Sequence, residues 1–400
     1  MNHPLTTLFK GSDYLKKHSK WLILGIVLLG ASMRMPITMI SPLLDQIAHG
    51  FNLQSGVLGG ITTIPLLCFA IVSPLAPRLA AKYSNEVVMF GAMIILAIAN
   101  FLRVFTPSAL FIGTLFIGIA IAMLNVLLPA TIAEKYPQRI GPVTSSYTFS
   151  MTLFSAITAG LSAPVAGKIG WPATLQSVSV IVVIGLLVWL PNLRYRETET
   201  VEEAQMTRSV WRVSGAWFLT IYMGIQSLIF YTTVTWLPTI LINHGLTPNM
   251  ASLMLGLSQL ASLPAAYFVP IWAAKRPRQT GLITTIAVFY VISLLLLMLP
   301  TTSLVVVVAV ALLLGITGNA TFTLAIAMFS LKTSTPRETA AISGMAQSGG
   351  YLLAAVGPLG FGLIHDLTHS WVIPLLVLIT LLGIMAVAGL AVDRKKTVFD

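Results

Sequence analysis

Long apolar runs separated by short polar segments dominate the chain. A helix needs roughly 20 mostly apolar residues to cross a bilayer. By this measure we predict twelve membrane-spanning helices, over residues 21–48, 53–77, 86–105, 108–134, 140–167, 172–192, 212–242, 249–274, 280–300, 303–331, 338–365 and 371–392. Most connections between them are only a few residues long. The expected fold class is therefore an all-α membrane protein with twelve transmembrane helices.

One polar segment divides this pattern near its middle. Residues 193–211 read LRYRETETVEEAQMTRSVW and contain four acids and three arginines, which predicts a solvated linker. It separates a six-helix bundle over 21–192 from a second six-helix bundle over 212–392. Residues 1–20 and 393–400 are expected to form tails.

The composition agrees with a membrane protein and excludes several soluble classes. Hydrophobic residues make up 56% of the chain and charged residues only 9%, against about 25% charged in a typical soluble protein. So few charges cannot cover a soluble surface, which excludes a cytosolic enzyme and a disordered chain. The single cysteine, Cys68, excludes an internal disulfide framework and a cysteine-based metal site.

The basic residues lie mainly on one side of the predicted membrane. Of 23 Lys and Arg residues, twenty fall in the tails or in loops on the side of both termini, while Arg103 and Lys168 fall on the other side and Arg34 within the bilayer. Basic loops mark the cytoplasmic side. We therefore predict a multi-pass protein of the bacterial inner membrane with both termini cytoplasmic. The net charge of +11 is then a topology signal, not a sign of nucleic-acid binding.

The two predicted bundles resemble each other in sequence. His49-Gly50 follows the first span and His244-Gly245 follows the seventh, an offset of 195, within LLDQIAHGFNLQSG and LPTILINHGLTPNM. Two six-helix halves in parallel repeat resemble the plan of the major facilitator superfamily, in which substrate binds near the membrane midplane between the halves.

Arg34 is the charge predicted deepest in the membrane. It lies 13 residues after Trp21, or roughly 20 Å along a helix. Its nearest acid in sequence is Asp45, and three further acids lie at span ends: Glu134, Glu338 and Asp366. A buried guanidinium without a carboxylate favours a partner with paired acceptors, which a bound anionic or dipolar substrate would supply. The alternative is that Arg34 binds backbone carbonyls and clamps helices together.

Three amides accompany Arg34 at depth. In a facilitator, spans 1, 4, 7 and 10 line the central cavity, and here they carry Arg34, Asn125, Gln226 and Asn319. The repeat offset carries Arg34 to Ile229, one helical turn from Gln226, so we expect Arg34 and Gln226 to face each other. The alternative for each amide is a hydrogen bond between helices.

Further candidates are aromatic or amide side chains in the spans, namely Tyr147, Tyr231, Trp236, Gln259, Gln347 and Tyr351. Their rings can stack on a planar ligand, although aromatics in spans also serve as packing residues and interface anchors. For gating or coupling we single out Asp45, His49, Arg78, Gly350 and Pro358. The glycine and the proline are possible hinges, and ordinary membrane-helix composition is the alternative for both.

The sequence lacks the residues that several kinds of chemistry need. The chain has no Walker loop for ATP and no histidine or carboxylate predicted at the midplane, which disfavours an acid-relay proton antiporter. Asp45, His49 or the substrate could still carry a proton. No Ser-His-Asp set or metal-ligand cluster falls at depth. We therefore expect neither an enzyme nor a cofactor or metal.

Several stretches resemble one family over nearly the whole chain. They are ISPLLDQIAHGF (40–51), NVLLPATI (125–132), TWLPTILINHG (235–245), SGMAQSGGYLLAAVGP (343–358) and IHD (364–366). They are similar to the cyanate and 2-nitroimidazole porters (CynX/NimT type) of the major facilitator superfamily, and closer to the 2-nitroimidazole branch. The family has an arginine shortly before the PLL of its first span, which corresponds to Arg34 here. The resemblance implies transport of a small polar or anionic molecule.

The loop after the second span departs from the wider superfamily. Its usual pattern is G-x-L-A-D-R-x-G-R, whereas this chain reads SPLAPRLAAK over 73–82. Leu75, Ala76 and Arg78 fit, but Pro77 replaces the acid. A cytoplasmic gate built on that acid is therefore not expected.

These observations predict a facilitator that works as a monomer by alternating access on a small-molecule substrate, surrounded by lipid. Arg34 would be the anchor, the amides would orient the ligand and Tyr231 and Tyr351 would form aromatic walls. The first rival is a broad-specificity multidrug efflux transporter of the same fold, which usually has a more apolar cavity and often a midplane acid. A membrane-embedded enzyme or sensor is a second rival, but no loop exceeds about 20 residues, too short for a signalling domain.

Overall fold

The computed structural model describes residues 21–136, 140–195, 210–333 and 336–399. The predicted tail over 1–20 and residues 196–209 of the predicted linker lie outside this part of the chain. Every regular element within it is a helix, so the predicted all-α fold is confirmed. Eleven segments of the described chain are long and apolar enough to cross a membrane.

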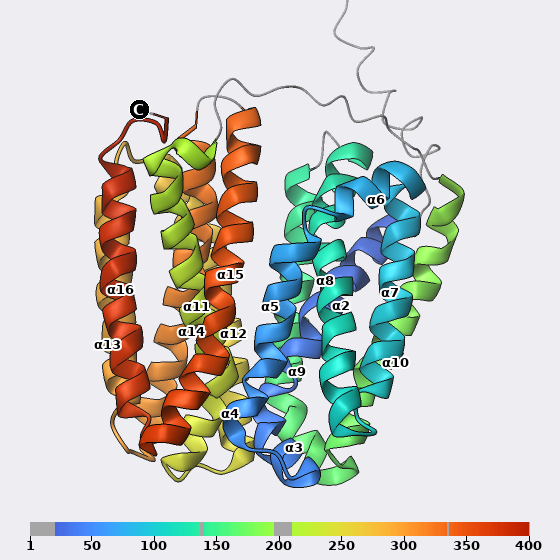
Figure 1. The fold of residues 1–400 in the computed structure, drawn as a ribbon, viewed down its shortest axis with the longest axis vertical. Coiled ribbons are helices and arrows are strands. Elements are labelled where there is room, and N and C mark those ends of the chain that lie inside the picture. The colour runs from blue at the N-terminus through green and yellow to red at the C-terminus, as the bar shows by residue number, and fades with distance from the viewer. Residues whose placement is uncertain (1–20, 137–139, 196–209, 334–335, 400) are drawn as a thin grey trace, which may run out of the picture.

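The helices form two bundles that lie side by side (Figure 1). The N-terminal bundle consists of α2 (Leu22–Thr38), η1 (Ser41–Leu43), α3 (Leu44–Phe51), α4 (Ser55–Leu58), α5 (Gly60–Val72), α6 (Ala76–Tyr83), α7 (Asn85–Leu102), α8 (Pro107–Lys135), α9 (Ile140–Ile169), α10 (Trp171–Trp189) and η2 (Leu190–Tyr195). The C-terminal bundle consists of η3 (Val210–Arg212), α11 (Ser214–Asn243), α12 (Pro248–Ala274), α13 (Thr280–Leu297), α14 (Leu304–Leu331), α15 (Pro336–Thr368) and α16 (Val372–Asp393).

Local signals in the sequence set several helix ends. Thr106 accepts a hydrogen bond from the N–H of Ala109 at 3.0 Å and is followed by Pro107, the first residue of α8. A hydroxyl cap before a proline is a strong start signal, because the proline needs no backbone donor at that position. After α11, Gly245 has a φ of +100°, a conformation that other residues rarely adopt.

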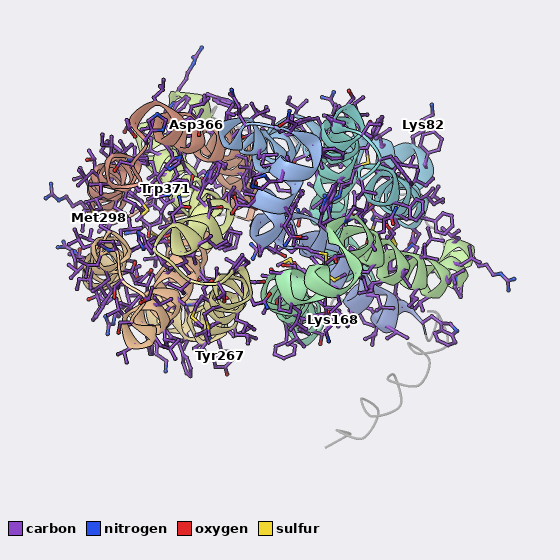
Figure 2. All side chains as sticks on the ribbon, turned by 90° about the horizontal axis from the view of Figure 1, so that it is seen from below. Lys82, Lys168, Tyr267, Met298, Asp366 and Trp371 are labelled. Atoms are coloured by element: carbon purple, nitrogen blue, oxygen red, sulfur yellow. The ribbon has the colours of Figure 1, made fainter. Side chains whose placement is uncertain are left out.

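The two ends of the molecule carry different elements. We call the upper end in Figure 1, which carries α6 and the residues after α16, the terminal face. The lower end carries α3 and α4, and we call it the opposite face. Figure 2 views the molecule from below, towards the opposite face, and shows the two bundles as separate groups of helices.

The predicted second span, 53–77, differs from its prediction. It forms α4 and then α5, which has only 13 residues and is too short to cross a membrane alone. Between them lies Gly59, where a Cβ would come within 2.6 Å of the carbonyl oxygen of Pro358 in the other bundle. Residues 55–72 therefore form an interrupted helix, and the interruption lies where the two backbones touch.

The first span is broken, whereas its counterpart in the repeat is continuous. α2 ends at Thr38, and the chain passes through η1 before α3 begins. Pro36 and Pro42 lack the backbone donors that a continuous helix needs. α11 runs for 30 residues without a break, although it contains Pro238. The repeat is thus asymmetric at the two helices that carry Arg34 and Gln226.

The bundles are joined between the middle of the helices and the opposite face. Thr235 donates a hydrogen bond to the hydroxyl of Thr62 at 3.0 Å, and Thr63 donates to the carbonyl of Ala355 at 2.8 Å. Further hydrogen bonds join α12 and α9 in the same region. Near the terminal face the two ribbons lie further apart (Figure 1).

Candidate functional site

A small cavity lies between the bundles. Its lining residues are Arg34, Gln226, Ser227, Phe230, Tyr231, Gly318, Asn319, Phe322 and Tyr351. Arg34 comes from α2, whereas the other eight come from α11, α14 and α15 of the C-terminal bundle. The space between them, open solvent included, is about 300 Å³.

Arg34 rests on the aromatic side of this cavity. Its guanidinium carbon lies 5.1 Å from the ring centroid of Phe230, which is a cation–π contact. The guanidinium also interacts electrostatically with Tyr231 and Tyr351. Among the described residues, no carboxylate lies within the 4.0 Å that defines an ion pair with Arg34. The charge of Arg34 is therefore balanced by rings and hydroxyl dipoles and not by an acid.

The two amides of the cavity are held by the C-terminal bundle itself. Gln226 is buried and donates through its Nε2 to the hydroxyl of Ser227 at 2.6 Å. Asn319 donates through its Nδ2 to the carbonyl of Ser262 at 2.9 Å. Because one donor of each amide is occupied, both side chains have a fixed orientation at the cavity wall.

Aromatic side chains form two further walls. Phe230 and Tyr231 contact each other edge to face with their centroids 5.2 Å apart. Tyr351 makes a similar contact at 5.5 Å with Phe69 of α5, in the other bundle. These pairs stabilise ring orientations, and they place flat apolar surfaces beside the guanidinium of Arg34.

Sequence reasoning missed four residues of the cavity, namely Ser227, Phe230, Gly318 and Phe322. Their helical spacing could have indicated them. Phe230 lies four residues after Gln226, and Phe322 three residues after Asn319, so each shares a helix face with a predicted amide. Phenylalanine carries no polar signal in an apolar span, and therefore composition alone does not distinguish these rings from packing residues.

Three other predicted ligand residues lie outside the cavity lining. Asn125 is exposed on α8, and Tyr147 on α9 is half-buried. The backbone and Cβ of Tyr147 pack against Gly30 of α2. Gln347 on α15 donates to the hydroxyl of Ser343 at 2.8 Å, one turn earlier on the same helix.

Trp236 and Gln259 lie between the cavity and the opposite face. The indole of Trp236 is buried and donates to the carbonyl of Pro358 at 2.8 Å. Gln259 donates to the hydroxyl of Ser155 at 3.2 Å, which joins α12 to α9. The structure thus places Gln259 at the junction of the bundles, and Trp236 beside Pro358, which meets Gly59 of the other bundle.

The remaining gating candidates fall in different regions. Asp45 is half-buried and His49 exposed, and both lie on α3 at the opposite face. Arg78 is exposed on α6 at the terminal face. Gly350 packs within the C-terminal bundle, where a Cβ would meet the backbone nitrogen of Gly224 at 3.1 Å. Gly350 therefore allows α15 to approach α11 closely.

The chain matches the family model described as Major Facilitator Superfamily over residues 22–358 and again over 225–398. It is 37% identical over 388 residues to the uncharacterized transporter YycB of Bacillus subtilis (strain 168), which covers 96% of each chain. It is 34% identical over 381 residues to the 2-nitroimidazole transporter of Escherichia coli (strain K12), covering 94% of this chain and 96% of that one.

A weaker match is the cyanate transport protein CynX of Escherichia coli (strain K12), 22% identical over 264 residues, with 64% of this chain and 68% of that one covered. The predicted likeness to cyanate and 2-nitroimidazole porters is thus confirmed. Among solved structures, a mutant of the nucleoside transporter NupG matches with a TM-score of 0.78 and 15% identity, over 93% of this chain and 99% of that one. At that identity the likeness shows the fold alone.

Proposed function

Because the chain belongs to the Major Facilitator Superfamily, whose members here are transporters and not enzymes, we propose that it carries a small polar, anionic or nitro-aromatic molecule by alternating access. The cavity between the bundles is the proposed binding site. Arg34 is the proposed anchor, and the bundles would rock about it to expose the cavity to each side in turn.

The observation that carries this proposal is the environment of Arg34. A guanidinium deep in a membrane protein is costly unless it finds charge or paired acceptors. Phe230 and the hydroxyls of Tyr231 and Tyr351 supply only partial compensation. A carboxylate, nitro or cyanate group would offer the acceptors that the guanidinium fork fits.

The other walls of the cavity suit a flat ligand. Phe230, Phe322 and Tyr351 offer rings on which a planar heterocycle can stack. The carbonyl oxygens of Gln226 and Asn319 can accept a hydrogen bond from a ring N–H. The identity to the 2-nitroimidazole transporter supports this choice of ligand class.

We place the terminal face on the cytoplasmic side of a bacterial inner membrane. The exposed basic residues on the elements of this face support the orientation, among them Arg78, Lys82, Lys275, Arg276 and Arg394. Since the bundles are joined towards the opposite face, this conformation would close the cavity to the outside. Because both bundles that line the cavity belong to one chain, we propose a monomer as the working unit.

A ligand screen on the purified protein tests the proposal. We expect 2-nitroimidazole, cyanate or a small aromatic carboxylate to raise the melting temperature, because a ligand at a hundred times its Kd adds about 2.7 kcal/mol of stability. Tetraphenylphosphonium, a hydrophobic cation, is included in the same screen to test the multidrug efflux alternative. Stabilisation by this cation and by none of the anionic or nitro compounds would favour the multidrug efflux alternative and contradict the proposal.

A further inference from the structure

A second buried guanidinium lies in the N-terminal bundle. Arg103 follows α7 and is 1% exposed. Its Nη1 donates a hydrogen bond to the carbonyl of Pro36 at 3.0 Å. Neither its Nε nor its Nη2 has a hydrogen-bond partner among the described residues. A cation that is buried with a single acceptor is costly, and packing alone would be served better by an apolar side chain.

The carbonyl that Arg103 binds lies at the break in the first span. In a continuous helix the N–H of Ile40 would bond to the carbonyl of Pro36, but here it bonds to the carbonyl of Ile37 at 3.4 Å. Arg103 takes the place of that missing donor. A positive charge at this position also stabilises the C-terminal end of α2, where the carbonyl dipoles accumulate.

The break lies between Arg34 and the contact with the other bundle. Arg34 is two residues before Pro36, and the hydroxyl of Thr38 donates to the carbonyl of Arg34 at 3.1 Å. After the break, η1 packs against α11 and α12 of the C-terminal bundle. A side chain that fixes the carbonyl of Pro36 therefore fixes the direction of Arg34 relative to the cavity wall on α11.

The C-terminal bundle has neither the break nor the arginine. α11 is continuous although it contains Pro238. The repeat offset carries Arg103 to Met298, which follows α13 (Figure 2). The buried arginine and the interrupted helix thus occur together in the same bundle. This is expected if the interrupted helix needs the arginine as a donor.

We propose that Arg103 is a positioning residue for substrate binding, which holds the broken first span so that Arg34 points into the cavity. This proposal rests on the proposed function, because Arg103 acts on the ligand only through Arg34.

Asn100 provides a matched control for Arg103. It is fully buried near the end of α7, one turn before Arg103, and donates to the carbonyl of Leu175 at 2.8 Å and the hydroxyl of Ser179 at 2.9 Å. Both acceptors belong to α10, not to α2. Asn100→Ala therefore removes buried hydrogen bonds of the same bundle without touching the break.

The experiment compares Arg103→Gln, Arg103→Lys and Asn100→Ala in full-length protein. We expect R103Q to weaken 2-nitroimidazole binding about tenfold, as for the loss of one charged hydrogen bond, and R103K to lie between R103Q and the wild type. N100A should lower the melting temperature and keep the wild-type Kd. Equal Kd values for R103Q and the wild type, or an equal loss in N100A, would overturn the proposal. If R103Q does not fold, R103K carries the comparison.

Hydrogen exchange separates this proposal from the proposed function. In R103Q, amide exchange over residues 37–43 should accelerate about tenfold relative to N100A, while exchange over residues 24–33 stays unchanged. If the wild type binds no 2-nitroimidazole but R103Q shows this local acceleration, the proposed ligand is wrong. The role of Arg103 in holding the broken first span is then still supported. Unchanged exchange over residues 37–43 would overturn the role of Arg103 whatever the ligand.

Discussion

The guanidinium of Arg34, on the first helix of one bundle, lies 5.1 Å from the ring centroid of Phe230, on the first helix of the other. This contact joins the two halves of the repeat at the cavity. Because Arg34 contacts a ring here and, among the described residues, no carboxylate, a negative ligand can approach the guanidinium without displacing an acidic side chain. The charge and the ring can therefore be tested separately.

Replacing Arg34 tests the charge. Arg34→Gln should weaken binding of 2-nitroimidazole or of a small aromatic carboxylate by about ten- to a hundredfold, because about 1.5–3 kcal/mol of charged hydrogen bonding is lost. Arg34→Lys should recover only part of the affinity, since an ammonium cannot bind two acceptors side by side. Isothermal titration measures both Kd values. An R34Q protein with wild-type affinity would show that Arg34 is a helix clamp.

Replacing Phe230 tests the ring. Phe230→Leu should lower affinity about two- to thirtyfold, because a cation–π contact is worth about 0.5–2 kcal/mol. Phe230→Tyr should stay close to the wild type, since it keeps the aromatic face. The comparison in the same titration isolates the ring from the volume of the side chain. Equal affinities for F230L and F230Y would mean that the ring does not hold Arg34 in place.

Two glycines at the junction of the bundles differ in the space around them. A Cβ at Gly256 would lie 2.7 Å from the Cα of Gly160, too close for any real contact. A Cβ at Gly160 would lie 3.5 Å from the Cα of Gly256, an ordinary van der Waals distance. We therefore predict that Gly256→Ala separates the bundles at the opposite face and that Gly160→Ala does not.

Spin labels at Ile169 and Leu367 measure this separation. Both residues are exposed, at the opposite-face ends of α9 and α15, and the only native cysteine, Cys68, is buried. In G256A the distance distribution should broaden towards longer values, while G160A keeps that of the parent. A change of the same size in both variants would contradict the prediction that a methyl group at position 256 pushes the bundles apart.

Near the terminal face, a buried ion-pair cluster makes stability depend on pH. The Nζ of Lys135 lies 3.3 Å from the Oε1 of Glu86 and 2.5 Å from the Oε1 of Glu134. Burial disfavours the charge of Lys135, but the hydrogen bonds and charges of the two acids outweigh it and raise its pKa. A raised pKa in the folded state stabilises the protein below the ordinary lysine pKa, and this stability is lost as pH rises through the raised value.

Lys135→Met should lower the free energy of unfolding by about 3 kcal/mol, because it leaves Glu86 buried without its partner. The difference in melting temperature from the wild type should shrink as pH rises above the ordinary lysine pKa. Lys168→Met, which removes an exposed lysine, serves as the control. A double variant, K135M with Glu86→Leu, should recover part of the loss. A K135M difference that stays constant as pH rises through the lysine range would contradict this account.

The sequence predicted most of the fold because each span is a long apolar run with a polar boundary. It did not predict the interruption at Gly59, which packs against Pro358 of the other bundle, a residue far away in the sequence. Nor does helical spacing fix the rotation of a span whose faces are all apolar. Gln226 lines the cavity, whereas Asn125, predicted on the same grounds, is exposed on α8 outside its lining, and its role stays a prediction.

The aromatic part of the cavity was harder to predict than its polar part. Arg34, Gln226 and Asn319 differ from their neighbours in polarity, so they were visible in the sequence. Phe230 and Phe322 differ from packing phenylalanines only in what lies opposite them. Arg103 was predicted only to lie on the other side of the membrane, because nothing in the local pattern indicates that its side chain reaches the carbonyl of Pro36.

The unequal share of the bundles in the cavity has a consequence for how such a carrier can diversify. One residue, Arg34, comes from the N-terminal bundle and eight come from the C-terminal bundle. Substitutions on α11, α14 and α15 can therefore change the shape and polarity of the accepted ligand while its charge requirement stays constant. Libraries that search for new specificities belong in the second half of the gene, with the codon for Arg34 left unaltered.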